Sequence, residues 1–210
     1  LVPSVQASRM TLAAAPEALQ GAVAAGILGS GSVILGASEN AGRLFSQIAA
    51  AIGGGAGLQQ AAADTISAYR HDGKAIPGYG HPLHKKRDPR VDALFRVARE
   101  TGADMSFVDI AEAVERAIPA IVGKPLRMNV SAAIPAVLMG VGFPLNALKG
   151  VPILARTAGL IAHLNEELEH PIGFALSYQA TREARYEGPV PQGFAEAADS
   201  VASAKRREGK

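Results

Sequence analysis

The sequence predicts an all-α fold made of closely packed helices. Of its 210 residues 48% are hydrophobic but only 5% aromatic, so Ala, Leu, Ile and Val must build most of the core. Ala and Leu favour helices. Gly and Pro divide the chain at intervals that suit helix ends, and almost no segment alternates apolar and polar residues as a half-buried strand does. The length allows one or two domains with a sizeable core.

The first part of the chain is expected to hold three helices. Residues 5–12 are mixed in character and are assigned to no element. A helix over 16–28 would start with a proline in its favoured first-turn position. Ser38 is expected to cap a helix that reaches residue 52. The apolar spacing of residues 58–69 predicts a further helix.

The second part is expected to begin with a long loop over 70–90, rich in Gly and Pro, and long loops are often functional. Helical spacing then predicts helices over 91–100, 107–118 (capped by Ser106), 130–139 and 145–168, the last kinked or started by Pro152. Residues 172–190 show no clear helical period. Residues 195–210 are expected to form a surface helix or a frayed tail.

Composition narrows the classes of function. Without cysteine the chain has neither disulfides nor a thiolate nucleophile, which fits a cytoplasmic protein. No apolar stretch reaches the roughly 18 residues of a spanning helix, and no signal peptide is recognised, so no membrane partner is expected. A net charge of +2 does not suggest nucleic acid, which attracts a dense basic stripe.

The basic residues nevertheless cluster within the 70–90 loop. Beside a Gly-rich turn, such a cluster suits a phosphorylated or carboxylated ligand, although a solvated basic loop is an equal alternative. The residues concerned are Arg70, Lys74, Lys85, Lys86, Arg87 and Arg90.

His81 ends the turn Gly78-Tyr79-Gly80. Two glycines let the backbone turn sharply and let a ligand approach closely, so this histidine could donate a hydrogen bond to a developing oxyanion. Taken alone, a histidine after glycine is more often solvated or a helix cap.

Two arginines could hold carboxylates. Arg90 follows Asp88-Pro89, where a stiff turn could present its guanidinium for a two-bond contact; a surface pair with Asp88 or Asp92 is the alternative. Arg156 lies within the most apolar predicted helix, so it must find a partner or line a cavity. The alternative there is a structural ion pair with a glutamate.

These motifs together resemble the citrate synthase family in order and spacing. The resemblance spans residues 4–171 and rests on the runs GYGH (78–81), DPR (88–90), NV (129–130) and ARTAGLIAH (155–163). Within the family it is strongest to citryl-CoA lyase-type short proteins and to the citryl-CoA lyase module of ATP-citrate lyase. It implies an all-helical fold that forms a homodimer or higher oligomer, with a large domain from 1–37 and 137–210 and a small domain from 38–136.

The resemblance also implies roles. His81 would hydrogen-bond the oxaloacetate carbonyl or the citryl alkoxide, and Arg90 and Arg156 would hold the dicarboxylate. Backbone over Pro77, Gly78, Tyr79 and Gly80 would lie along the coenzyme A thioester, which is a substrate. The chemistry would make or break a C–C bond between acetyl-CoA and oxaloacetate through citryl-CoA, and no metal is expected.

Three positions depart from the family pattern. The first catalytic histidine falls at Ile34, which cannot donate a hydrogen bond, as in the ATP-citrate lyase module. The catalytic aspartate falls at Ser131, whose hydroxyl has little basicity without an adjacent base. The arginine given by the neighbouring subunit falls at His170, which need not be charged at neutral pH.

Two functional hypotheses follow. The chain is either a lyase-like enzyme, with Glu39, His84 or a water replacing the aspartate, or a catalytically impaired protein that binds CoA or a dicarboxylate as a regulatory subunit. A helical scaffold without a ligand is a third reading, but it leaves the ordered motifs unexplained.

Overall fold

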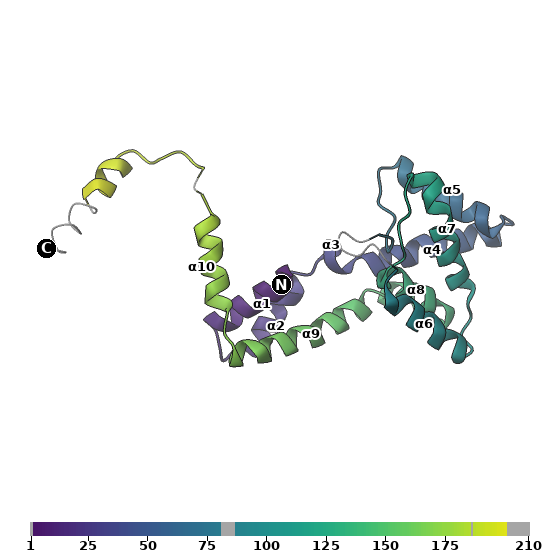
Figure 1. Ribbon diagram of the computed structural model, residues 1–210, viewed down its shortest axis with the longest axis horizontal. Coiled ribbons are helices and arrows are strands. Elements are labelled where there is room, and N and C mark those ends of the chain that lie inside the picture. Colours follow the sequence, from purple (N-terminus) through teal and green to yellow (C-terminus); the bar gives the residue numbers. More distant parts are fainter. Residues whose placement is uncertain (1, 81–86, 186, 201–210) are drawn as a thin grey trace. The chain divides into compact units, whose positions relative to one another are not determined.

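The computed structural model describes residues 2–80, 87–185 and 187–200. The chain divides into two compact units, Leu1–Gly173 and Phe174–Lys210. Figure 1 shows helices joined by loops, and the one extended pairing among the described residues is an isolated bridge between Tyr79 and Met128. The prediction of an all-α fold is confirmed.

Three helices of the first unit pack against one another (Figure 1). They are α1 (Pro3–Ala14), α2 (Leu19–Leu28) and α9 (Gly150–Glu169). Leu12, Ala22 and Leu164 form a small buried cluster among them. A side chain at Gly26 would put its Cβ only 2.9 Å from the Ser4 carbonyl oxygen and 2.7 Å from a Leu160 methyl. Glycine therefore allows these helices their close approach, which places α9 beside α1.

Five further helices of the same unit surround the main apolar core. They are α4 (Ala37–Gly53), α5 (Leu58–His71), α6 (Pro89–Glu100), α7 (Ser106–Val122) and α8 (Val130–Gly140). Their largest buried side chains include Phe45, Ile48, Ile66, Phe95 and Ile118. The fully buried members of this cluster lie within residues 41–136. The expected domain boundaries at 37/38 and 136/137 stay a prediction.

Short elements join the two groups of helices. The turn of helix α3 (Ser32–Leu35) precedes α4, and the 3-10 turn η1 (Leu145–Ala147) precedes α9. The expected helix over 145–168 is therefore interrupted, and Pro152 lies in the first turn of α9, where its missing N–H costs no hydrogen bond.

The N-terminal predictions were partly wrong. Residues 5–12 belong to α1, whose buried face includes the polar Ser8 and Arg9, so its apolar period is hard to recognise. Helix α2 begins at Leu19, three residues after the expected start. Gly36, and not Ser38, precedes α4, and Ser38 is buried inside the first turn.

The second unit also differs from expectation. Residues 172–190, for which no helix was expected, contain helix α10 (Gly173–Glu183). Phe174 and Tyr178 are largely exposed, so this helix buries little. Residues 194–200 are helical and exposed, and residues 201–210 lie outside the described range, so the tail stays a prediction. In the described ranges, no helix is both long and apolar enough to cross a membrane.

Candidate functional site

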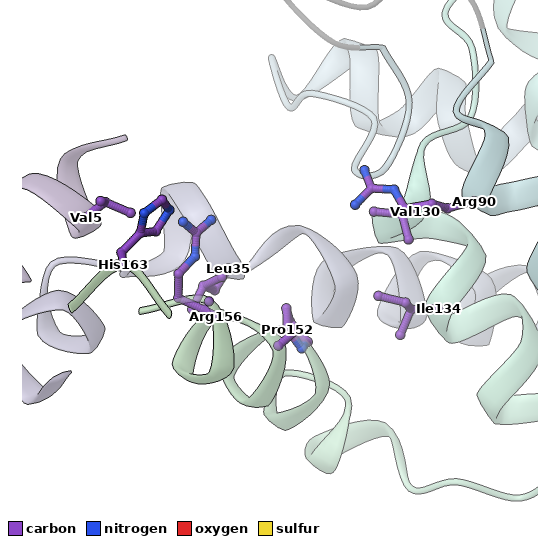
Figure 2. A pocket seen from close by; sticks show the side chains of 10 residues that line it. Val5, Leu35, Arg90, Val130, Ile134, Pro152, Arg156 and His163 are labelled. Atoms are coloured by element: carbon purple, nitrogen blue, oxygen red, sulfur yellow. The ribbon is translucent and has the colours of Figure 1, made fainter. Parts of the chain in front are cut away.

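A cavity of about 360 Å³ lies in the first unit, lined from α1, α3, α6, α8 and α9 (Figure 2). Arg90, Arg156 and His163 give it its charged and titratable side chains. The remaining lining residues are Val5, Leu35, Val130, Ile134, Pro152, Ala155 and Gly159. No carboxylate is among the lining residues that the structure describes. Two guanidinium groups over an apolar wall favour an anionic ligand with carboxylate groups.

Arg156 and His163 stand on one face of α9, two turns apart, and Figure 2 shows both side chains on the same side of the helix. Arg156 Nη1 donates to Ser4 Oγ over 3.3 Å. Among the described residues, Arg156 forms no ion pair with a glutamate, so that alternative is not seen there. Its guanidinium is left with donors for a ligand.

Arg90 is held at the start of α6 by Asp88. The Asp88 carboxylate accepts from Arg90 Nε (3.0 Å), Arg90 Nη2 (2.7 Å) and the Arg90 backbone N–H (3.0 Å). It also accepts from the Val130 N–H (3.2 Å) at the start of α8. The side-chain hydrogen bond from Arg90 lowers the pKa of Asp88. The alternative pairing of Arg90 with Asp88 is therefore present, although Arg90 also lines the cavity.

The Gly-rich turn is fixed against α7 and the start of α8. Gly78 and Gly80 both have φ of +83°, in the region that favours glycine. A Cβ on Gly78 would lie 2.5 Å from Ala132 Cβ. The Tyr79 hydroxyl donates to the Ala111 carbonyl (2.7 Å), and burial raises the pKa of Tyr79 well above its ordinary value. The close approach that Gly78 allows in this structure is that of Ala132 in α8.

Asn129 ties the same turn to α8. Its backbone N–H donates to the Gly78 carbonyl (3.0 Å) and its side-chain amide donates to the Gly80 carbonyl (2.9 Å). Its side-chain oxygen accepts from the Ser131 N–H (2.9 Å), as an N-cap. One side chain thus fixes both the residue before His81 and the helix that carries Ser131. His81 itself lies outside the described residues.

Glu115 of α7 anchors the chain at Arg87, where the described residues resume. Its Oε2 pairs with Arg87 Nη1 (3.0 Å) and its Oε1 accepts from the Met128 N–H (3.0 Å). Arg87 also contacts Asp92 of α6 at 3.2 Å. Arg87 thus serves structure, whereas Lys85 and Lys86 of the basic cluster lie outside the described residues.

None of the three departing positions is among the described residues that line the cavity. Ile34 is in α3, next to the lining residue Leu35. Ser131 is half-buried on α8, between the lining residues Val130 and Ile134 but not itself among them. His170 follows α9 and is exposed.

The side chains expected to replace the aspartate are not brought to Ser131 by any contact that the structure describes. Glu39 pairs with Arg43 at 2.6 Å on the surface of α4. His84 lies outside the described residues.

A second cavity of about 450 Å³ adjoins the start of the Gly-rich turn, because Pro77 lines it. Arg43 and Lys74 give it two cations, and Tyr69 gives it an aromatic face. The other lining residues are Ser32, Ala37, Asn40 and Ala75. Its polar and aromatic lining differs from that of the first cavity.

Sequence reasoning missed a buried ionic cluster beside the first cavity. Arg9 of α1 is 3% exposed and pairs with Glu166 and with Glu167 Oε2 (3.1 Å). Glu167 Oε1 accepts from the N–H groups of Ile172 (2.9 Å) and Gly173 (2.6 Å), just after His170. The signal in the sequence was a charged residue on the apolar face of each helix, Arg9 in α1 and Glu167 in α9. A buried charge requires a partner.

Comparisons with known proteins agree with this architecture. Residues 3–173 match the family described as "Citrate synthase, C-terminal domain". The structure of citryl-CoA lyase from Hydrogenobacter thermophilus is similar with a TM-score of 0.77 and 33% identity, covering 91% of this chain and 72% of that one.

More distant relatives share the fold. The structure of citrate synthase from Thermoplasma acidophilum, a ternary complex with carboxymethyl coenzyme A and oxaloacetate, gives a TM-score of 0.68 at 22% identity over 91% of this chain and 49% of that one. A citrate synthase-like protein of Phoma sp. is 30% identical over 119 residues, 52% of this chain but only 26% of the Phoma protein. The chain therefore belongs to the citrate synthase family.

Proposed function

We propose that this protein cleaves or forms the C–C bond between an acyl-CoA, acetyl-CoA in the simplest case, and a 2-oxo acid such as oxaloacetate, through a citryl-CoA-like thioester. The observation that carries the proposal is the pair Arg90 and Arg156 in one cavity whose described lining residues include no carboxylate. The likeness to a citryl-CoA lyase at 33% identity supports the lyase branch.

In the cleavage direction, the citryl hydroxyl loses its proton and its oxygen becomes the carbonyl of the 2-oxo acid. The electrons of the broken C–C bond pass to the thioester fragment, whose carbon then takes up a proton to give the acyl-CoA. Arg90 and Arg156 would hold the carboxylates, and His81 would hydrogen-bond the reacting oxygen. No metal takes part in this scheme.

We further propose that coenzyme A lies along Pro77, Gly78, Tyr79 and Gly80. The second cavity supports this, because Pro77 lines it together with Arg43 and Lys74. Cations beside an aromatic ring suit the phosphates and the adenine of a nucleotide-like ligand.

The proposal is tested by assaying the protein with citryl-CoA, and with acetyl-CoA plus oxaloacetate. Arg156→Ala should lower kcat/KM by about 10- to 100-fold, since a charge-assisted contact contributes roughly 1.5–3 kcal/mol. Arg96→Ala is the matched control, because Arg96 is exposed on α6 and pairs with Glu100 at 3.0 Å, away from the cavity. An inactive wild-type protein, or equal effects of the two substitutions, would exclude the proposal.

Ser131 favours a second candidate function, a binding or regulatory subunit without turnover. Calorimetry would then show CoA or dicarboxylate binding while both assays stay silent. Ser131→Asp separates the two candidates further: a large gain in citryl-CoA cleavage would show a site complete except for its base, whereas no gain would indicate altered geometry.

We also propose a homodimer or higher homo-oligomer, in which His170 reaches the neighbouring subunit. Helix α9 exposes Leu154 (73%), Ile161 (49%) and Leu168 (61%), spaced seven residues apart along one stripe. Leu154→Glu should shift the molecular mass in sedimentation toward the monomer, and an unchanged mass would exclude this face. A cytoplasmic location stays a prediction, consistent with the absence of cysteine.

A further inference from the structure

The two arginines of the first cavity stand apart, with apolar side chains between them. In Figure 2, Arg156 of α9 and Arg90 of α6 lie toward opposite sides of the cavity, and Pro152 lies between them. Ile134 of α8 and Leu35 of α3 line the same space. A ligand that pairs with both guanidinium groups must therefore place its middle against these apolar side chains.

The apolar floor is the surface formed by Leu35, Ile134 and Pro152. Ile134 follows the lining residue Val130 by one turn of α8, so both side chains face the cavity. Leu35 is only 5% exposed, so packing holds it in place. The floor is therefore a built part of the cavity wall.

The described lining residues offer a ligand charged groups or hydrocarbon, and little between these extremes. Apart from the two arginines and His163, each of them has an apolar side chain or none. A hydroxyl or amide turned toward the floor would lose its water without gaining a side-chain partner there. The reacting oxygen of the proposed reaction is assigned to His81, so the floor meets the other substituents of the ligand.

We propose that the apolar floor selects a dicarboxylate that bears an alkyl group on the carbon chain between its two carboxylates. The inference rests on the proposed function, because it names the class of 2-oxo acid that the site takes, an alkyl-branched relative of oxaloacetate. Two carboxylates match two arginines, both in such an acid and in a citryl-type thioester. Ile134 is then a specificity-determining residue.

Alkyl dependence separates the contribution of the floor from that of the arginines. The carboxylates of a branched and an unbranched diacid are the same, so the guanidinium groups hold both equally well. A methyl group that leaves water for the floor strengthens binding by about fourfold when it is fully buried.

Titration calorimetry with succinate, methylsuccinate and 2,2-dimethylsuccinate tests the inference without turnover, because these diacids lack the reacting carbonyl. In the wild-type protein, each added methyl group should strengthen binding by about three- to fourfold. The arginine contacts are common to the three ligands and cancel in the comparison.

Two substitutions of nearly equal shape at Ile134 isolate polarity from volume. Ile134→Val stays apolar and should keep most of the gain per methyl group. Ile134→Thr places a hydroxyl in the floor and should reduce that gain to less than about twofold. Val97→Thr is the matched control and should keep the wild-type gain, because Val97 is 47% exposed on α6 and lines neither cavity described here.

The ratio of two affinities measured on one protein sample does not depend on how much of that sample is folded, so partial misfolding does not imitate the expected result. Methyl groups that leave the wild-type affinity unchanged or weaken it would overturn the inference. An equal gain per methyl group in Ile134→Thr and Ile134→Val, or a wild-type protein that binds none of the three diacids, would overturn it as well.

The inference and the proposed function can fail separately. Cleavage of citryl-CoA by a protein that does not prefer methyl-bearing diacids would refute the inference and keep the function. A preference that depends on Ile134, in a protein without turnover, would keep the inference and refute the function.

Discussion

The guanidinium of Arg90 and the carboxylate of Asp88 form a two-bond ion pair at the edge of the first cavity, with Nε–Oδ1 at 3.0 Å and Nη2–Oδ2 at 2.7 Å. The same carboxylate caps α6 and accepts from the Val130 N–H of α8. One side chain therefore orients a proposed ligand-binding arginine and joins two helices. A ligand carboxylate must share or replace this contact.

Asp88→Asn should make the free energy of unfolding depend less on pH in the acidic range. The hydrogen bond from the Arg90 side chain lowers the pKa of Asp88, so the folded protein holds fewer protons there than the unfolded chain. Its stabilisation is therefore present above the unfolded pKa of about 3.9 and is lost as pH falls through the lower folded value. Urea unfolding between about pH 5 and pH 2 should show a shallower loss for Asp88→Asn, which still caps α6.

Asp64→Asn, an exposed position on α5, is the control for that series. The same pH slope in Asp88→Asn as in the wild type would mean that the Arg90 contact does not stabilise the fold.

Arg9→Met should destabilise the protein strongly. Arg9 and Glu167 are both 3% exposed, and removing one partner leaves a buried charge uncompensated, which costs about 3–5 kcal/mol. The double variant Arg9→Met with Glu167→Gln should recover part of that loss. Arg96→Met, which breaks an exposed pair with Glu100, should stay within about 0.5 kcal/mol of the wild type in urea unfolding. Equal losses in Arg9→Met and Arg96→Met would contradict the buried cluster.

Gly78→Ala should cost more than Gly73→Ala. Both glycines have positive φ (+83° and +70°), which costs alanine about 1–2 kcal/mol. Only at Gly78 would the added methyl also meet α8, 2.5 Å from Ala132 Cβ, whereas nothing lies within 4 Å at Gly73. Overpacking adds roughly 1–3 kcal/mol. Calorimetric unfolding measures the melting temperatures of the Gly78→Ala and Gly73→Ala variants. Equal values would argue against close packing of Gly78 on Ala132 of α8.

Tyr79 should resist ionisation while the protein is folded. Burial raises its pKa well above the ordinary value of about 10, and Glu115 adds to the effect. The folded state then keeps a proton that the unfolded chain loses, so stability falls as pH rises above about 10. Tyr79→Phe should lessen that alkaline loss while costing about 0.5–1.5 kcal/mol near neutral pH, because the bond to Ala111 is gone. Urea unfolding followed by circular dichroism, near neutral pH and above about pH 10, measures both effects. An alkaline loss of stability in Tyr79→Phe equal to that of the wild type would contradict the prediction.

The cores of several helices could be predicted because their apolar positions repeat with the helical period. Residues 58–69 and 91–100 are examples, since α5 and α6 bury one face each. In α1 the buried face includes the polar residues Ser8 and Arg9, so the apolar residues alone do not repeat with the helical period. Helix α10 was not predicted either, and it buries only Gly173 among its residues.

The sequence by itself determined the helical class and the family motifs. It also holds the Gly-rich turn and the two arginines from which a carboxylate ligand is proposed. Only the tertiary structure decided which side chains share a cavity. Arg90 and Arg156 are 66 positions apart, and their sharing of one cavity depends on how α6 packs on α8 and how α9 packs on α1 and α2. Arg9 became informative for the same reason: contacts between distant helices fix the partners of a buried charge, and local periodicity carries no record of them.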